Sequence, residues 1–358
     1  MSEILTETRG ALGVITLNRP EALNALTHPM VRAMTDALHA FGTDDAVARV
    51  LITGAGERAL CAGGDVVGLR DDVQRTRGQA AASFWRDEYR LNALIARYPK
   101  PIVALQHGIV LGGGVGISGH ASHRVVTDST RIGFPEVTIG FVPDVGATWL
   151  LTRRRGELGT RAALSGDHFG AADAIALGLA DTYVAADRLA ELVSGLETTH
   201  PDALLEHLGT EPPAGTLEAA RPMIDAAFAG DDALSILERL RAAGEEGHTL
   251  AASIERRSPF AVAVTLAALR RARAHRSLEE SLVQEYRVSL HTALAADFSE
   301  GVRAQLVDKD RNPKWTPSSL AGVTPAMVEA CFAPVPGGDL VFGDAAPATA
   351  ARAQPDQV

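Results

Sequence analysis

The chain has 358 residues, of which 46% are hydrophobic, so it is long enough for one large domain or two modest ones with a substantial core. Its formal net charge of −10 argues against a nucleic-acid-binding protein, because such proteins usually carry a basic face. The two cysteines, Cys61 and Cys331, form neither a disulfide framework nor a metal-binding pattern.

The first residues, "MSEILTETRG", are polar and lead straight into a strand pattern, which is not the pattern of a signal peptide. No apolar run reaches the length that spans a bilayer. We therefore expect a soluble, cytoplasmic protein that has no membrane partner.

The first half of the chain predicts strands that alternate with helices. "ILTETRGALGVITLNRP" alternates on both sides of Arg9-Gly10, as a hairpin does, and ends at Pro20. Thr27 is suited to cap a helix that has Pro29 in its first turn. "ARVLITGAG" and "PIVALQ" are typical of buried strands, and "RDEYRLNALIARYPK" between them is typical of a helix. After a glycine loop and a short helix come the short strands "RVVTD" and "RIGFPE". The repeated order strand, strand, helix predicts a mixed α/β core.

The second half of the chain predicts helices. Residues 188–230 are rich in Ala, Glu and Pro with weak periodicity, and we expect helical structure there. Ser258-Pro259 starts one helix, and Ser277 caps another while Glu280 reaches back, in a capping box. The last stretch is too rich in Ala, Pro and Gly to pack well. We predict a core over 1–187 that carries the active site, a mostly helical region over 188–332 and a disordered tail over 333–358.

The segment "LGGGVGISGH", residues 111–120, contains a match to the dinucleotide-binding pattern G-x-G-x-x-G. That pattern requires a strand running into the first glycine, a helix of about a dozen residues and an acid after the next strand. Here "HGIVL" separates the strand from the glycines, and the next strand begins near Arg124. The context therefore disfavours a dinucleotide site, while a tight backbone crossing that needs glycine stays open.

A third interpretation of the glycines involves their backbone N–H groups. Three glycines at the start of a helix expose N–H groups where the helix dipole favours negative charge. "CAGGDV", residues 61–66, is a second glycine-rich corner that follows a strand. One N–H group from each corner would form an oxyanion hole for a carbonyl whose oxygen gains charge.

Three segments, "CAGGDV", "HGIVLGGGVG" and "FPEVTIGFVPDVG", resemble the crotonase (enoyl-CoA hydratase/isomerase) superfamily, and the resemblance extends to about Thr324. It implies an α/β fold, a crotonase-type spiral of ββα units with a helical C-terminal region. It also implies an acyl-CoA substrate whose thioester carbonyl is polarised by the N–H groups of Gly64 and Gly113. Coenzyme A is then part of the substrate, so we expect no separate cofactor and no metal. Crotonases are often trimers or dimers of trimers, which makes a homo-oligomer a candidate assembly.

The resemblance also bears on the reaction. Hydratases of this superfamily place two glutamates around the water that they add; one position matches Glu136, and the other falls on Gly116. "FWRDEYRLN", "EYRVSL" and "DFSEGVRAQLVDKDRNPKW" resemble instead the 3-hydroxyisobutyryl-CoA hydrolase branch, the thioesterases of valine degradation. The functional positions of that branch fall on Glu88, Gly113, Glu136 and Asp144. We therefore expect hydrolysis of 3-hydroxyisobutyryl-CoA, with an enoyl-CoA hydratase/isomerase or a non-catalytic acyl-CoA-binding protein as alternatives.

Thioester hydrolysis assigns a role to each acid. Glu136 could attack the carbonyl carbon and form a mixed anhydride, or act as general base on a water. Asp144, with Glu88 nearby, would hold the water or the 3-hydroxyl group of the substrate. Acids that share an apolar pocket raise the pKa of at least one of them.

Plainer interpretations of the same acids stay open in the sequence. Glu136 follows a proline and could be an acid in a surface turn. Asp144 could cap the next helix, since Asp is a favoured N-cap. Glu88 could be a solvated helix acid paired with Arg86 or Arg90.

Two further groups of residues favour structural roles. His107, His120 and His123 suggest a hydrolase triad, but no serine or cysteine nucleophile lies in a suitable elbow, since "GISGH" is not G-x-S-x-G. The basic cluster at 153–155 could meet CoA phosphates or form a solvated helix face, and we favour the solvated face.

Overall fold

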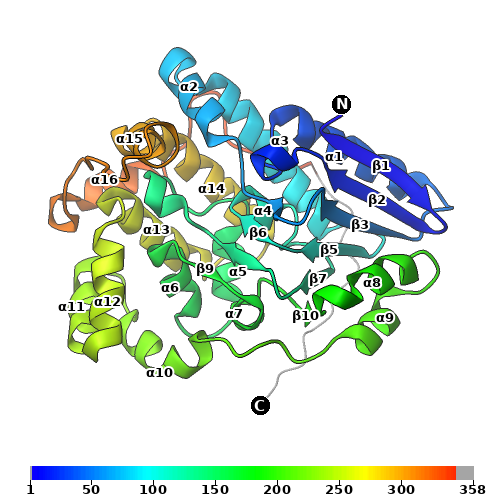
Figure 1. The fold of residues 1–358 in the computed structure, drawn as a ribbon. Coiled ribbons are helices and arrows are strands. Elements are labelled where there is room, and N and C mark those ends of the chain that lie inside the picture. The colour runs from blue at the N-terminus through cyan, green and yellow to red at the C-terminus, as the bar shows by residue number, and fades with distance from the viewer. Residues whose placement is uncertain (1, 344–358) are drawn as a thin grey trace.

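The strands of the protein form two sheets, as seen in a computed structural model that describes residues 2–343 (Figure 1). The large sheet has the order β1-β2-β3-β5-β7-β10, and the small sheet has the order β4-β6-β8-β9. The large sheet consists of β1 (Ile4–Arg9), β2 (Leu12–Leu17), β3 (Arg49–Gly54), β5 (Ile102–Gln106), β7 (His123–Val126) and β10 (Thr182–Tyr183). The small sheet consists of β4 (Ala59–Cys61), β6 (Ile109–Leu111), β8 (Arg131–Gly133) and β9 (His168–Phe169).

The chain winds as a spiral in which each turn leaves one strand in each sheet. β3 is followed by β4, β5 by β6 and β7 by β8, and the successive turns pair in parallel in both sheets. Helices α2 (Val66–Thr76) and α3 (Gln79–Ala96) follow β4, α4 (Gly113–Gly116) follows β6, and η2 (Glu136–Ile139) and α5 (Ala147–Arg153) follow β8. The predicted spiral of ββα units is confirmed. Because parallel strands end at the same edge, the segments after β4, β6 and β8 meet there.

Local sequence signals produce the first elements as predicted. β1 and β2 form an antiparallel hairpin that closes at the pair Arg9 and Leu12. Helix α1 (His28–Thr43) begins where Thr27 accepts a hydrogen bond from the N–H of Met30, and Pro29 lies in its first turn. Its apolar stripe is buried against the core, as the 3.6-residue period requires.

The C-terminal region consists of helices that pack on the spiral. Ser258 caps α13 (Pro259–Ala272) and Ser277 caps α14 (Leu278–Ala293), as predicted. The carboxylate of Glu280 does reach back, although to the N–H of Arg276. The other helices of the second half are α6 (Leu158–Ser165), α7 (Ala171–Ala176), α8 (Leu189–Gly195), α9 (Pro201–Leu208), α10 (Leu217–Ala227), α11 (Ala233–Ala242), α12 (Gly244–Glu255), α15 (Ala296–Val302) and α16 (Pro325–Ala330), with a π-helix over Arg303–Val307.

The predicted boundary at residue 187 does not separate two hydrophobic cores. Helices α8 and α9 cover one face of the large sheet, where Leu192 and Leu204 join a cluster with Val14 and Leu51 of the strands. The main core likewise contains buried residues from α3, α13 and α14 together. The helical region is therefore part of the same packed unit as the spiral (Figure 1).

The predicted disordered tail over 333–358 lies partly outside the described residues, which end at residue 343. Its first part packs on the helices, since Val335 and Leu340 are buried and Asp339 forms an ion pair with Arg287 at 2.6 Å. Residues 333–343 therefore contact the packed helices through two apolar side chains and one ion pair.

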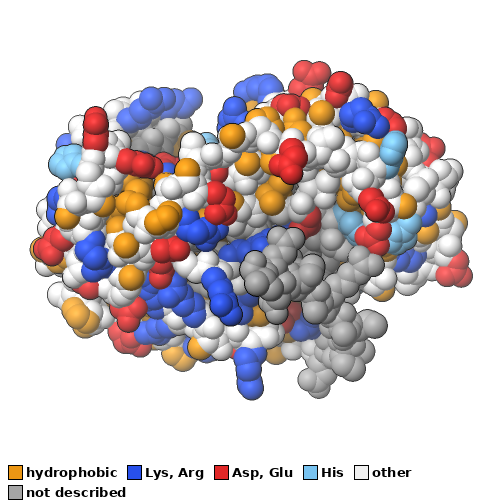
Figure 2. All heavy atoms as spheres, turned by 90° about the horizontal axis from the view of Figure 1, so that it is seen from below, with side chains coloured by type: hydrophobic (Ala, Val, Ile, Leu, Met, Phe, Trp, Pro, Cys, Tyr) orange, Lys and Arg blue, Asp and Glu red, His pale blue; other side chains and the backbone are white. Residues whose placement is uncertain are grey.

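Two surface properties bear on possible partners. Within residues 2–343, no helix is both long and apolar enough to cross a membrane. The face shown in Figure 2 carries acidic and basic side chains side by side, so the acidic excess of the chain does not form one continuous field on that face.

Candidate active site

A cavity of about 450 Å³ lies where the segments after β4, β6 and β8 meet. Apolar and aromatic side chains form most of its wall, among them those of Phe84, Trp85, Phe141 and Phe298. Every site residue that the sequence predicts lines it: Gly64, Glu88, Gly113, Glu136 and Asp144. The spiral thus brings together residues from four separate segments in a largely apolar pocket.

The glycine corners place two N–H groups beside each other in this cavity. Helix α4 is a single turn that begins inside the glycine triplet, with Gly112 at its N-cap at φ 48°. A Cβ atom on Gly113 would lie only 3.3 Å from the backbone nitrogen of Gly64. Within the described residues, neither N–H group donates a hydrogen bond to another group. Both are free to donate to one ligand oxygen.

The same glycines also form the tight backbone crossing that the sequence left open. A Cβ atom on Gly112 would lie 2.5 Å from Oε1 of Glu136, and one on Gly113 would lie 2.7 Å from Oε1 of Glu88. A Cβ atom on Gly114 would lie 2.2 Å from the carbonyl oxygen of Cys61. Side chains are absent here because carboxylates and backbone occupy their space.

Glu136 is a buried acid at the start of η2. The positive φ of Gly140, 70°, ends this short helix, and Glu136 is only 6% exposed. Its Oε2 has no hydrogen-bond partner among the described residues, so it is not an acid in a surface turn. Burial, followed by the charge of Asp144, raises the pKa of Glu136 well above its ordinary value.

Asp144 does not cap the next helix. The N-cap of α5 is Gly146, and no side chain caps that helix. The Oδ2 atom of Asp144 instead accepts a hydrogen bond of 2.6 Å from the hydroxyl of Tyr89. Burial raises the pKa of Asp144 to about 7, and the Tyr89 hydrogen bond opposes that rise.

Glu88 points from α3 into the protein rather than into solvent. It is 2% exposed and its Oε1 lacks a hydrogen-bond partner among the described residues. Arg86 lies over the ring of Tyr286 and Arg90 donates to a backbone carbonyl, so neither pairs with it. Burial first, then the charges of Asp144 and Glu136, raise the pKa of Glu88 well above its ordinary value. The three acids lie in one buried cavity, and the negative charge of one raises the pKa of another.

The histidines have the structural roles that the sequence favours. Nε2 of His120 lies 2.8 Å from the carbonyl of Val145, and burial lowers the pKa of His120 to about 4. His107 contacts the carbonyl of Gly56 at 3.1 Å, and His123 contacts Asp202 at 2.9 Å. They form no triad. In the basic cluster, Arg153 stacks on Trp149 with 4.1 Å to the ring centroid.

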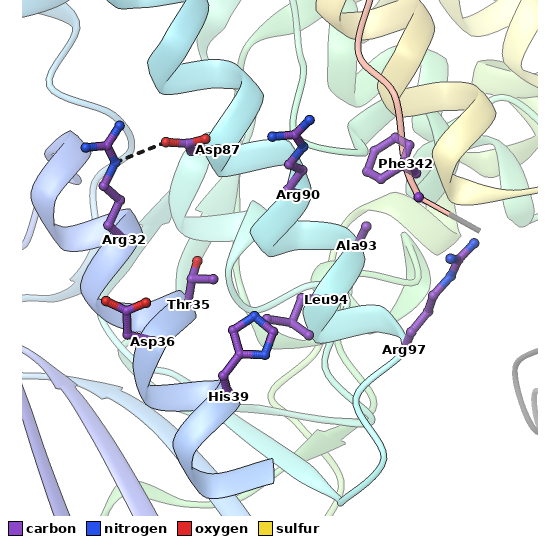
Figure 3. Close-up of a pocket in the computed structure, with 11 residues that line it drawn as sticks. Arg32, Thr35, Asp36, His39, Asp87, Arg90, Ala93, Leu94, Arg97 and Phe342 are labelled. Carbon is purple, nitrogen blue, oxygen red and sulfur yellow. Dashed lines mark hydrogen bonds and ion pairs between the residues drawn. The ribbon is translucent and has the colours of Figure 1, made fainter. Parts of the chain in front are cut away.

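A second cavity, of about 700 Å³, lies between α1 and α3 and contains none of the predicted site residues (Figure 3). Three of its charged side chains already have charged partners, since Arg32 pairs with Asp87 at 3.1 Å and Arg97 pairs with Glu279 at 2.5 Å. Convergent acids and free backbone donors are features of the first cavity.

The comparisons with known proteins agree with this geometry. The family described as "Enoyl-CoA hydratase/isomerase" matches residues 12–332, which is most of the chain. The chain belongs to the enoyl-CoA hydratase/isomerase family. As a member, it is 38% identical to the mitochondrial 3-hydroxyisobutyryl-CoA hydrolase of Danio rerio and 36% identical to that of Homo sapiens, over 95% of this chain and 91% of each relative.

Two solved structures of the family are also similar along nearly the whole chain. One is described as a carnitinyl-CoA dehydratase from Mycobacterium thermoresistibile, with 48% identity and a TM-score of 0.92 over 96% of this chain and 100% of that one. The other is described as an enoyl-CoA hydratase from Rhodobacter sphaeroides 2.4.1, with 39% identity and a TM-score of 0.89 over 95% of this chain and 100% of that one.

Gly116 sets this family member apart from the two-glutamate pattern. A Cβ atom there would lie 2.7 Å from Cβ of Val145 and 3.0 Å from Nδ2 of Asn92. The position therefore lacks a carboxylate and has no room for one in this backbone conformation. Glu136, Asp144 and Glu88 are the carboxyl groups that remain in the cavity.

The sequence missed the residues that hold the acids. Tyr89 contacts Asp144, and Glu285 accepts hydrogen bonds from the N–H groups of Gly146 and Thr148 at 2.6 and 2.8 Å. Tyr89 lies within "RDEY" and Glu285 within "EYRVSL", two segments that carry the resemblance. Nothing in their local spacing reveals a contact that joins residues this far apart in the chain.

Proposed function

We propose that this chain is a thioesterase that hydrolyses 3-hydroxyisobutyryl-CoA to 3-hydroxyisobutyrate and CoA, a step in the breakdown of valine. The observation that carries the proposal is the buried carboxylate of Glu136 beside Gly112, in the same cavity as the free N–H groups of Gly64 and Gly113. An attacking group and an oxyanion site are the two parts that acyl transfer requires. The names of the animal relatives support the same substrate.

In the first route, Glu136 acts as the nucleophile. The thioester carbonyl oxygen accepts hydrogen bonds from the N–H groups of Gly64 and Gly113. A carboxylate oxygen of Glu136 then forms a bond to the carbonyl carbon. The carbon–sulfur bond breaks, CoA leaves as a thiolate that gains a proton, and a mixed anhydride remains on Glu136. Water then opens the anhydride and restores the carboxylate.

In the second route, Glu136 removes a proton from a water that attacks the carbonyl carbon directly. The carbon–sulfur bond breaks, and the proton held by Glu136 passes to the leaving CoA thiolate. The two routes differ in the first turnover. An anhydride that accumulates gives a burst of CoA equal to the enzyme concentration, ahead of the acid product. Release of CoA and acid at equal rates from the start supports the general-base route.

Asp144 and Glu88 have the supporting role in either route. Both line the cavity and neither pairs with a cation among the described residues, so each is available to the 3-hydroxyl group or to the attacking water. Burial raises the pKa of each acid, which favours its protonated form and makes both acids candidate proton donors to the leaving thiolate.

Hydration of an enoyl-CoA is the second candidate, since the two similar solved structures are described as a dehydratase and a hydratase. The missing side chain of Gly116 disfavours it. The purified protein is given 3-hydroxyisobutyryl-CoA and crotonyl-CoA, with thiol release and loss of enoyl absorbance followed separately. Rapid enoyl loss without thiol release reverses the assignment, and binding without either signal supports a non-catalytic acyl-CoA-binding protein.

Three accompanying predictions have their own tests. We expect no cofactor or metal beyond the CoA of the substrate, so dialysis against a chelator leaves CoA release unchanged. A homo-oligomer is a candidate assembly, and sedimentation distinguishes it from a monomer. We expect a cytoplasmic location, whereas several animal relatives are named mitochondrial, and cell fractionation distinguishes the two compartments.

A further inference from the structure

Helix α14 contacts the Asp144 segment at two separate points, although it belongs to the C-terminal region. Ser289 and Glu285 lie four residues apart on α14, so both project from the same face of the helix. Ser289 reaches Tyr89, which in turn reaches Asp144, and Glu285 reaches the turn that follows Asp144. All four side chains are buried.

The first contact is a directed chain of hydroxyl groups. Tyr89 has a single hydroxyl hydrogen and donates it to Oδ2 of Asp144 at 2.6 Å. The hydroxyl of Ser289, 2.8 Å from the Tyr89 oxygen, must then donate to Tyr89. Donation from Ser289 makes the Tyr89 hydrogen a better donor, and burial keeps Tyr89 protonated by raising its pKa. The hydrogen bonds from Ser289 to Tyr89 and from Tyr89 to Asp144 therefore stabilise the ionised form of Asp144.

The second contact fixes the backbone after Asp144. Val145 and Gly146 both have positive φ, 57° and 83°, which is an unfavourable conformation for valine. Glu285 accepts the N–H of Gly146 at 2.6 Å, and its other oxygen accepts the N–H and the hydroxyl of Thr148 at 2.8 and 2.6 Å. The carbonyl of Val145 contacts His120. These hydrogen bonds hold Val145 and Gly146 in the positive-φ turn, which is unfavourable for valine without them.

We propose that Tyr89, Ser289 and Glu285 are positioning residues that orient Asp144 for the hydrolysis proposed above, on which this inference rests. Tyr89 and Ser289 fix one carboxylate oxygen, so that the other faces the substrate. Glu285 keeps the strained turn from relaxing and carrying Asp144 away. The C-terminal helix is thereby a part of the active-site framework.

The test compares Tyr89→Phe with Tyr286→Phe. Tyr286 is a buried tyrosine on α14 that donates to the carbonyl of Ala82 at 3.3 Å and does not touch Asp144, so it is a matched control. The titratable groups facing Asp144 are Glu88 and Tyr89 from α3, Glu136 from η2 and Glu285 from α14. Both variants retain these carboxyl groups.

The titration of Asp144 is followed by ¹³C NMR of labelled aspartate, assigned with Asp144→Asn. Loss of a hydrogen bond to a charged group raises the midpoint by roughly one to two pH units in Tyr89→Phe. The acid limb of the kcat profile moves in the same direction, and Ser289→Ala gives a smaller shift of the same sign. Tyr286→Phe leaves both readouts at the parent values.

The outcomes separate this inference from the proposed function. An Asp144 midpoint that is unchanged in Tyr89→Phe overturns the positioning role, whatever the activity of the parent. If the Asp144 midpoint shifts in Tyr89→Phe but the parent releases no CoA, the positioning role is supported and the hydrolase function is refuted. Glu285→Gln completes the test, because its amide nitrogen places a donor against the N–H of either Gly146 or Thr148. We expect the kcat of Glu285→Gln to fall more than tenfold while its KM stays near that of the parent. A kcat equal to that of the parent removes Glu285 from the proposal.

Discussion

The two sides of the cavity are built on opposite principles. On the glycine side, Gly64 and Gly113 offer backbone N–H groups, and a Cβ atom on Gly113 would lie 2.7 Å from Oε1 of Glu88. On the acid side, Glu136 and Asp144 offer carboxylates, and the position of Asp144 depends on side chains from α3 and α14. We therefore expect an added side chain at Gly113 to disturb the glycine side and a lost side-chain contact to disturb the acid side. The predictions below challenge each side in turn.

The largest effect is expected on the acid side, from Glu136→Gln. The amide keeps the shape of the side chain but is neither a nucleophile nor a base, so kcat should fall by roughly 10²–10⁴-fold. Binding of the acyl-CoA, measured by calorimetry, should persist. A variant with kcat within about tenfold of the parent would take the central role away from Glu136.

The glycine side is tested by Gly113→Pro, which removes one of the two N–H groups. Loss of one oxyanion donor should lower kcat by roughly 10²–10³-fold. Gly113→Ala is the comparison, because it keeps the N–H while its Cβ approaches Oε1 of Glu88 at 2.7 Å. Circular dichroism verifies that both variants are folded, and a folded, fully active proline variant contradicts the oxyanion site.

The crowding between the two sides is tested by Gly116→Ala. The new Cβ would meet Val145 at 2.7 Å, and overpacking of this kind costs about 1–3 kcal/mol of unfolding free energy. Gly170→Ala is the matched control, since nothing lies within 4 Å of a Cβ there. Urea unfolding measures both variants. Equal stability of the two would show that Val145 can move, and would reopen this position to a carboxylate.

The smallest effect is on the pH dependence of stability. Asp144 and Glu285 have ordinary pKa values of 3.8 and 4.5, which rise to about 7 and about 8 in the folded protein. At a pH between the ordinary and the raised pKa values, the two carboxyl groups are protonated in the folded protein and ionised in the unfolded chain. Their stabilising contribution is therefore complete below pH 3.8 and is lost as the pH rises through about 7 and about 8.

Asp144→Asn should flatten this dependence between pH 4 and 7, by at most about 1.4 kcal/mol per pH unit for one proton. Thermal unfolding across that range measures the slope. Asp45→Asn, at an exposed position, should leave the slope unchanged. A slope that Asp144→Asn does not alter would mean that Asp144 is not protonated in the folded state.

The same contrast explains what could be predicted from the sequence. Glycine spacing, the hairpin around Gly10 and the caps at Thr27, Ser258 and Ser277 are local patterns, and the structure has each of them. The resemblance supplied the positions of the acids. The supports of Asp144 were not predictable, because the Tyr89–Ser289 contact joins residues 200 positions apart. Local pattern also could not show that Gly146, and not Asp144, is the N-cap of α5. Nor could it show that Glu88 is buried.

The distance in sequence between α14 and the turn that it holds has a consequence for refolding. The contacts of Glu285 with Gly146 and Thr148 span 139 and 137 positions, and loops of that length close late because their ends must first be brought together. We expect the spiral to form its parallel strands before α14 docks. Helical signal should therefore return ahead of CoA release when the denatured chain is diluted into buffer, with a delay that lengthens when Glu285 is replaced. Catalysis would then be the last property that the chain acquires.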